Sequence, residues 1–387
     1  MEPLEIKKDI YWVGAIDWDL RNFHGYLTQL GSTYNAYLII DEKKTLVDTV
    51  KQYKFEEMLG RIKRLIDPSK IDYVISNHSE MDHSGGLPGI MDIAKKATII
   101  ASPNGEKGLK KHFKKDWKFK VVNIGDSVNI GRRNLNFVLT PMVHWPDSMV
   151  TYIPEDKLLL SNDAFGQHVA STRRYDDEYG WDRMRQEAAK YYANIVLPYG
   201  AQVAKALETV SGLELDMIAP SHGLIWRSRI KDIIGLYKKW ADNVCAEKAV
   251  IVYDTMWHST EQMAYIIRDI FEEKNIPCEI KNLQTNHISD IMTSVLDSKY
   301  ICVGSPTLNN GMLPTVSAFL TYMKGLGPKN RIGMAFGSYG WGGQAVSEIE
   351  GILEACGFQV PLKGLKVQWV PDNVELESLK ERIRRIL

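Results

Sequence analysis

The segment from Asn77 to Gly86 constrains this chain more than any other, because it places two imidazoles and two carboxylates within six residues. The apolar residues just before it, 71–75, are typical of a buried strand. The polar run therefore falls on the loop at the end of that strand, where several ligands can converge on a metal. Four ligating side chains from one short loop would crowd a single tetrahedral ion, so the run favours a pair of metal ions.

Three further apolar runs, at 135–139, 157–160 and 215–219, each end shortly before a His or an Asp. One such residue alone is most often a turn former or a surface residue. Together with the first run, these residues predict that several strand ends open on one metal-binding cleft. The predicted ligands are His78, Glu80, Asp82, His83, His144, Asp163 and His222.

The spacing of the first run resembles the metallo-β-lactamase superfamily, whose dinuclear site uses His-x-His-x-Asp-His, then a distant His, a bridging Asp and a final His. In this chain Glu80 takes the place of the middle His. A carboxylate supplies hard, anionic oxygen, which favours iron or manganese over zinc and stabilises the higher oxidation state of a redox cycle. With this exchange the chain is similar to the flavodiiron proteins, also called A-type flavoproteins, over essentially its whole length.

That resemblance implies a role for each candidate ligand. His78, Glu80 and His144 are expected to bind one iron. Asp82, His83 and His222 are expected to bind the other, and Asp163 is expected to bridge the two.

Two more histidines lie close to these ligands in the chain. The resemblance places His24 near the open side of the metal pair, where it would donate a hydrogen bond or a proton; a buried structural histidine is the alternative. His168 follows Asp163 by five residues and is expected at the surface.

After about Cys245 the pattern changes to alternating strands and helices. A short apolar strand at 249–253 is followed by a hydroxyl-rich loop and by apolar residues at helical spacing. This alternation predicts a doubly wound parallel sheet. Further strands are expected at 277–283, 299–303, 331–336 and 360–370, with a helix around 346–356.

Three loops of this second region follow successive strands. A strand, a hydroxyl-rich loop and a helix together place N–H groups and hydroxyls around a phosphate, although hydroxyls near a helix start are commonly only N-caps. The order of the three loops resembles flavodoxin, which implies that the first holds the FMN phosphate and the others flank the isoalloxazine. The residues concerned are Thr255, Met256, Trp257, His258, Ser259 and Thr260, then Pro306, Thr307, Leu308, Asn309 and Gly311, and finally Ser338, Tyr339, Gly340, Trp341, Gly342 and Gly343.

The length of 387 residues allows two full cores. We expect an α/β protein with an N-terminal metallo-β-lactamase-like αββα sandwich over 1–245 and a C-terminal flavodoxin-like doubly wound parallel sheet over 246–387. The 48 basic and 48 acidic residues balance, so bulk charge implies neither nucleic acid nor membrane as a partner. No run approaches the ~20 apolar residues of a membrane span and the start of the chain lacks an apolar signal core, so a soluble cytoplasmic protein is expected.

The resemblance implies an oxidoreductase that reduces a small diatomic gas, either dioxygen to water or nitric oxide to nitrous oxide. Two ferrous ions and a fully reduced flavin hold the four electrons that dioxygen needs. The four cysteines form no Cys-x-x-Cys, so electrons must come from an external donor: rubredoxin, a flavin reductase or a reduced deazaflavin. A head-to-tail homodimer or homotetramer is also implied. The alternatives are a dinuclear zinc hydrolase with an appended flavin domain and a non-enzymatic electron carrier.

Overall fold

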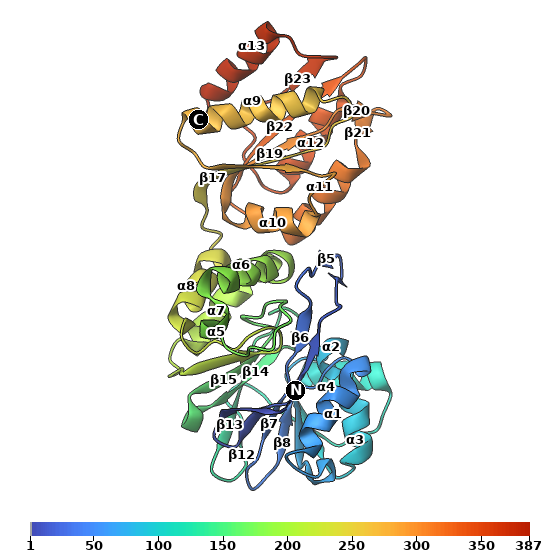
Figure 1. The fold of residues 1–387 in the computed structure, drawn as a ribbon, viewed down its shortest axis with the longest axis vertical. Helices are drawn as coiled ribbons and strands as arrows, with labels where there is room; N and C mark the ends of the chain where they lie inside the picture. Colours follow the sequence, from blue (N-terminus) through green and yellow to red (C-terminus); the bar gives the residue numbers. More distant parts are fainter. Residues whose placement is uncertain (1) are drawn as a thin grey trace. The chain divides into compact units, whose positions relative to one another are not determined.

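The computed structural model describes residues 2–387, which divide into two compact units (Figure 1). The first unit comprises the residues up to 191 together with 201–238, and the second comprises 192–200 and 239–387. None of the helices formed by residues 2–387 combines the length and the apolar character that crossing a bilayer requires.

The first unit contains two main sheets. The seven-stranded sheet has the order β1-β2-β7-β8-β9-β10-β11, and its strands from β8 onward are parallel. The five-stranded sheet runs β12-β13-β14-β15-β16, with β15 and β16 parallel. The bounds are β1 (Leu4–Lys7), β2 (Ile10–Trp12), β7 (Tyr37–Ile39), β8 (Thr45–Val47), β9 (Tyr73–Ser76), β10 (Thr98–Ala101), β11 (Phe119–Val121), β12 (Ser127–Asn129), β13 (Asn134–Leu139), β14 (Met149–Ile153), β15 (Leu158–Asn162) and β16 (Met217–Pro220). Two small ribbons pair β3 (Ala15–Asp17) with β6 (Ser32–Tyr34) and β4 (Asn22–Phe23) with β5 (Tyr26–Leu27).

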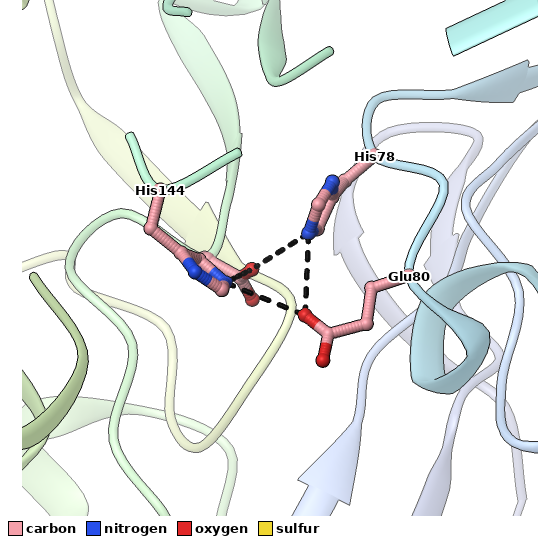
Figure 2. A group of neighbouring side chains, drawn as sticks. His78, Glu80 and His144 are labelled. Atoms are coloured by element: carbon pink, nitrogen blue, oxygen red, sulfur yellow. Dashed lines mark hydrogen bonds and ion pairs between the residues drawn. The ribbon is translucent and has the colours of Figure 1, made fainter. Parts of the chain in front are cut away.

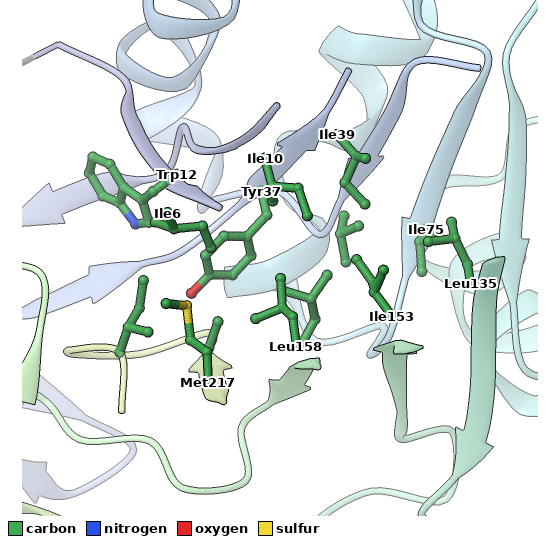
Figure 3. Close-up of a cluster of buried hydrophobic side chains, with 14 of the residues drawn as sticks. Ile6, Ile10, Trp12, Tyr37, Ile39, Ile75, Leu135, Ile153, Leu158 and Met217 are labelled. Carbon is green, nitrogen blue, oxygen red and sulfur yellow. The ribbon is translucent and has the colours of Figure 1, made fainter. Parts of the chain in front are cut away.

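The core of this unit lies between the two sheets. Figure 3 shows Ile10 and Ile75 from the first sheet packed with Ile153 and Leu158 from the second. A second apolar cluster fills the other face of the seven-stranded sheet, beneath α1, α3 and α4. The predicted αββα sandwich is therefore confirmed. Its helices are α1 (Phe55–Lys63), α2 (Met81–Ser84), α3 (Leu87–Ile93), α4 (Pro103–Phe113), α5 (Asp176–Tyr179), α6 (Trp181–Tyr191), α7 (Gly200–Val210) and α8 (Ile230–Ala241).

The second unit is built on one parallel sheet in the order β18-β17-β19-β22-β23. This is the flavodoxin-like strand order 2-1-3-4-5, with helices on both faces (Figure 1). The predicted doubly wound sheet is thus confirmed. Its elements are β17 (Ala246–Tyr253), α9 (Ser259–Glu273), β18 (Cys278–Asn282), α10 (Ile288–Asp297), β19 (Ser298–Gly304), β20 (Thr307–Leu308), β21 (Gly311–Met312), α11 (Pro314–Leu326), β22 (Ile332–Tyr339), α12 (Gln344–Ala355), β23 (Leu365–Gln368) and α13 (Asn373–Arg384).

The strand expected at 360–370 is wrong in its extent, because β23 covers only Leu365–Gln368. Pro361 has no amide hydrogen to give to a ladder. Gly364 and Trp369, on either side of the strand, both have positive φ, 64° and 60°. The chain therefore turns at both ends of a four-residue strand.

Candidate metal centre and flavin site

The predicted ligands all lie at the ends of strands in the first unit. His78 and Glu80 follow β9, and Asp82 and His83 lie on α2 directly after them. The remaining three ligands come from the second sheet. His144 lies between β13 and β14, while Asp163 and His222 follow the parallel strands β15 and β16.

His78, Glu80, His144 and Asp163 form one cluster (Figure 2). Glu80 Oε2 lies 3.3 Å from His78 Nε2 and 3.4 Å from His144 Nε2. Asp163 Oδ2 lies 3.2 Å from His144 Nε2 and 3.7 Å from His78 Nε2. The carboxylate of Glu80 therefore points into the site rather than away from it.

Asp82, His83 and His222 form the second cluster. His222 Nε2 lies 3.0 Å from Asp82 Oδ2, and His83 Nε2 lies 3.4 Å from Asp82 Oδ1. Asp163 reaches this cluster with its other oxygen, because Oδ1 is 2.9 Å from His83 Nε2. The two oxygens of Asp163 thus face different clusters, which is the arrangement of a bridging carboxylate.

Several of these buried atoms make no hydrogen bond of good geometry within the described chain, although some of them lie within ion-pair distance of one another. They are both carboxylate oxygens of Asp82 and of Asp163 and both ring nitrogens of His83. Leaving buried polar atoms unsatisfied is costly, so their convergence fits a site whose cations complete the bonding. Imidazole nitrogen with several carboxylate oxygens is a ligand set that suits iron.

The electrostatics of the site favour charged groups. Burial disfavours the charged forms of His78, His83 and His144, yet the adjoining carboxylates raise their pKa values to about 10, about 9 and about 10. Burial would raise the pKa of Asp163, but the neighbouring imidazoles hold it well below its usual range. Without metal, the site is therefore a network of imidazolium and carboxylate groups at neutral pH.

Iron uptake by the metal-free protein is expected to release protons. A ligating histidine must be neutral, and the raised pKa values keep His78, His83 and His144 protonated until the pH approaches those values. The apparent affinity for Fe²⁺ should therefore rise steeply from about pH 6 to about pH 9. Anaerobic calorimetric titrations in buffers of different ionisation enthalpy measure the protons released. An affinity that is flat or falling over this range would contradict the expectation.

Asp147 is a functional residue that the sequence reasoning missed. Its two oxygens lie 3.2 and 3.1 Å from His78 Nδ1, and one of them accepts the backbone N–H of Ser79 at 2.6 Å. This contact leaves His78 Nε2 facing the cluster. His222 is held in the same way, since its Nδ1 lies 2.7 Å from the backbone oxygen of Thr33.

Asp147→Ala is expected to lower iron affinity by about 10- to 100-fold, because the His78 ring loses the partner that orients it. Iron per chain after dialysis against a graded chelator series measures the effect. Asp126→Ala is the matched control, because Asp126 also accepts a backbone N–H, that of Asn123 at 2.7 Å, outside the metal site. Equal iron retention in both variants would show that Asp147 does not orient a ligand.

Asp48 connects the loops that carry the ligands and was also missed. It is buried, and its carboxylate accepts the backbone N–H of Asn77 at 2.8 Å and the side-chain amides of Asn77 and Asn162 at 3.1 and 3.4 Å. Ser221 Oγ lies 3.5 Å from the same carboxylate. These three partners directly precede His78, Asp163 and His222 in the chain.

The two additional histidines differ in their surroundings. The His24 side chain is 75% exposed and its Nε2 lies 3.1 Å from Glu80 Oε1, so the alternative of a buried structural histidine does not hold. The expectation that His168 lies at the surface is wrong, because this residue is only 1% exposed. A buried position is possible since Ser32 Oγ lies 2.7 Å from its Nδ1 and its ring packs 4.8 Å from that of His222.

The second unit has an open pocket with about 1460 Å³ of empty space, including its mouth, at the carboxyl ends of the sheet strands. All three predicted loops contribute to it. The predicted residues that line it are Met256, Trp257, Ser259, Pro306, Thr307, Leu308, Asn309, Ser338, Tyr339, Gly340, Trp341 and Gly342.

The other predicted flavin residues are not among those lining the pocket: Thr255, His258, Thr260, Gly311 and Gly343. Thr260 Oγ1 instead lies 2.9 Å from Ser338 Oγ, whereas Thr255 Oγ1 is buried without a hydrogen-bond partner in the described chain. Asn310, inside the predicted loop between Thr307 and Gly311, also lines the pocket, and so do two residues that were not predicted, Trp369 and Val370. The last two follow β23, inside the segment that was assigned to a longer strand.

Comparisons with known proteins agree with this architecture. Residues 33–223 match the model for the ODP family beta lactamase and residues 251–382 match the flavodoxin model. A crystal structure of the flavodiiron protein from Giardia intestinalis matches with a TM-score of 0.97 and 34% identity, over 100% of this chain and 96% of that one. The chain belongs to the flavodiiron family.

Two curated relatives of this flavodiiron protein carry enzyme names. The nitric oxide reductase of Moorella thermoacetica is 44% identical over 100% of this chain and 98% of its own length. The rubredoxin-oxygen oxidoreductase of Megalodesulfovibrio gigas is 42% identical over the same shares. The protein is thus an oxidoreductase, and the predicted cofactors, FMN and a diiron centre, agree with the flavodoxin match and the two ligand clusters.

Proposed function

We propose that this flavodiiron protein reduces a diatomic gas, either dioxygen to water or nitric oxide to nitrous oxide, with electrons from an external donor. The observation that carries the proposal is the position of Glu80, whose carboxylate contacts the ring nitrogens of both His78 and His144. An anionic oxygen ligand there suits a redox-active ion better than the zinc of a hydrolase. The names of the two relatives support both gases and do not separate them.

The residues of the site have distinct tasks in this proposal. His78, Glu80 and His144 would hold one iron, Asp82, His83 and His222 would hold the other, and Asp163 would lie between the two. When bound, the irons and the flavin store and deliver the electrons that the reduction consumes.

His24 is proposed as the residue that brings protons to the site. Its side chain is 75% exposed and its Nε2 lies 3.1 Å from Glu80 Oε1, so the ring can carry a proton between water and the Glu80 carboxylate.

The division into a diiron domain at 1–245 and an FMN domain at 246–387 belongs to the same proposal. The proposal also includes a rubredoxin or a flavin reductase as the electron donor. It further includes a head-to-tail homodimer, which would bring the flavin of one subunit to the irons of another. The donor is supported by the names of relatives, rubredoxin-oxygen oxidoreductase and flavorubredoxin.

Gas consumption by anaerobically photoreduced protein tests the proposal. We expect two irons and one FMN per chain, and rapid removal of dioxygen or nitric oxide from a closed electrode cell. The Glu80→His variant restores the nitrogen ligand of the lactamase pattern and is expected to bind zinc in preference to iron and to lose gas reduction. Native protein that contains zinc without iron and hydrolyses a test ester or lactam would instead establish the alternative, a dinuclear zinc hydrolase.

A further inference from the structure

An apolar pocket lies in the first unit between helix α7 and the five-stranded sheet. It holds about 350 Å³ of empty space, including its open mouth. Residues of β14, β15, α7 and α8 form its walls. Among them are Val150, Leu159, Val203, Ala206, Leu207 and Val210.

The polar groups of this pocket are bonded within the protein. Ser161 Oγ donates to the backbone oxygen of Ala164 at 2.7 Å, and Tyr237 Oη accepts the backbone N–H of Phe165 at 2.8 Å. None of the described residues lining the pocket has a buried side-chain nitrogen or oxygen that lacks a partner, and none of them is charged. Water gains little in such a space, whereas small apolar species such as xenon enter apolar cavities readily.

Three residues of the pocket wall are close neighbours of metal ligands in the chain. Val143 directly precedes His144, and Ala164 and Phe165 directly follow Asp163. The backbone segments that carry two of the candidate ligands therefore also form part of the pocket wall. The side of the site near His24 is different, because it presents an exposed imidazole and a carboxylate.

We propose that this pocket binds the diatomic substrate and supplies it to the metal centre from the apolar side. The inference rests on the proposed function for the identity of the gas. Dioxygen and nitric oxide are small and nearly apolar, so they are favoured in an apolar pocket that offers water and ions no free polar partner. Protons reach the site from the polar side at His24, so the gas and the protons approach the metal centre from different sides.

Xenon pressure on crystals of the holoprotein tests the binding step without any turnover. We expect a xenon atom between α7 and the sheet, in contact with Val150, Leu159 or Val203. Crystals that take up xenon elsewhere and leave this pocket empty would overturn the proposal.

Ala206→Phe tests the supply step. The phenyl ring would fill the pocket from α7, and we expect the second-order rate of reoxidation of the photoreduced protein by dissolved gas to fall at least several-fold. Iron and FMN contents and the rate of flavin photoreduction should stay unchanged. Ala201→Phe is the matched control, because Ala201 lies on the same helix but is exposed.

The two variants separate this proposal from the proposed function. Equal reoxidation rates in both would overturn the gas pocket while leaving gas reduction intact. Absence of gas reduction in the unaltered holoprotein would overturn the proposed function, and the xenon result would still report on the pocket.

Discussion

Asp163→Ala is expected to remove both irons from the protein. The two oxygens of this carboxylate face different clusters, at 3.2 Å from His144 Nε2 and 2.9 Å from His83 Nε2. Its loss also leaves the imidazolium groups of both clusters without their shared counter-charge. We expect iron below one tenth of the native content by elemental analysis and a loss of gas reduction of about 100-fold or more.

Single-cluster variants provide the comparison for this result. His144→Ala removes a ligand from the first cluster only, and His222→Ala from the second only. Each should retain more iron than Asp163→Ala, because one cluster keeps its ligands. If Asp163→Ala instead loses no more iron than these variants, Asp163 does not bridge.

Asp48→Ala is expected to have the largest effect among residues that do not touch a metal. The substitution leaves the backbone N–H and the side-chain amide of Asn77 without an acceptor in a buried region, whereas the amide of Asn162 keeps Ser221 Oγ at 3.2 Å. Each unsatisfied buried group costs about 1–3 kcal/mol, so the free energy of unfolding should fall by about 2 kcal/mol or more. Urea denaturation of the metal-free protein measures it, and iron content should fall with it because the ligand loops lose their common anchor.

Asp72→Ala is the matched control for Asp48. Asp72 also accepts a backbone N–H, that of Lys44 at 2.9 Å, but it lies just before β9, at the opposite end of that strand from the loop that carries His78. We expect a loss of about 1 kcal/mol and native iron content. Iron loss in both variants would assign the effect of Asp48→Ala to general destabilisation.

The residues of the two clusters were recognisable in the sequence because His, Asp and Glu are concentrated at strand ends, where they contribute nothing to an apolar core. Asp147 and Asp48 were not predicted, because an isolated aspartate near a strand end is most often a turn former. Their importance depends on partners 69 and up to 173 residues away in the chain. Asp48 nevertheless directly follows the apolar strand Thr45–Val47, which is the same signal that identified the ligands.

The flavin loops illustrate a different limit. Hydroxyl-rich and glycine-rich loops were recognisable by composition, but the direction of each side chain depends on tertiary contacts. Thr260 contacts Ser338 rather than lining the pocket, and Trp369 reaches the pocket because its backbone adopts a positive φ of 60° after β23. A pattern of apolar residues carries no information about such a turn.

The ligands of this site are spread over two sheets, with four of the seven before residue 84 and the last at His222. A ribosome-bound chain that has completed only the seven-stranded sheet still lacks Asp163. It also lacks the second histidine of each cluster, His144 and His222. The complete set of seven residues comes together only after residue 222 has emerged and the second sheet has closed on the first. We therefore expect the complete metal centre to form late, after both sheets of this unit have folded.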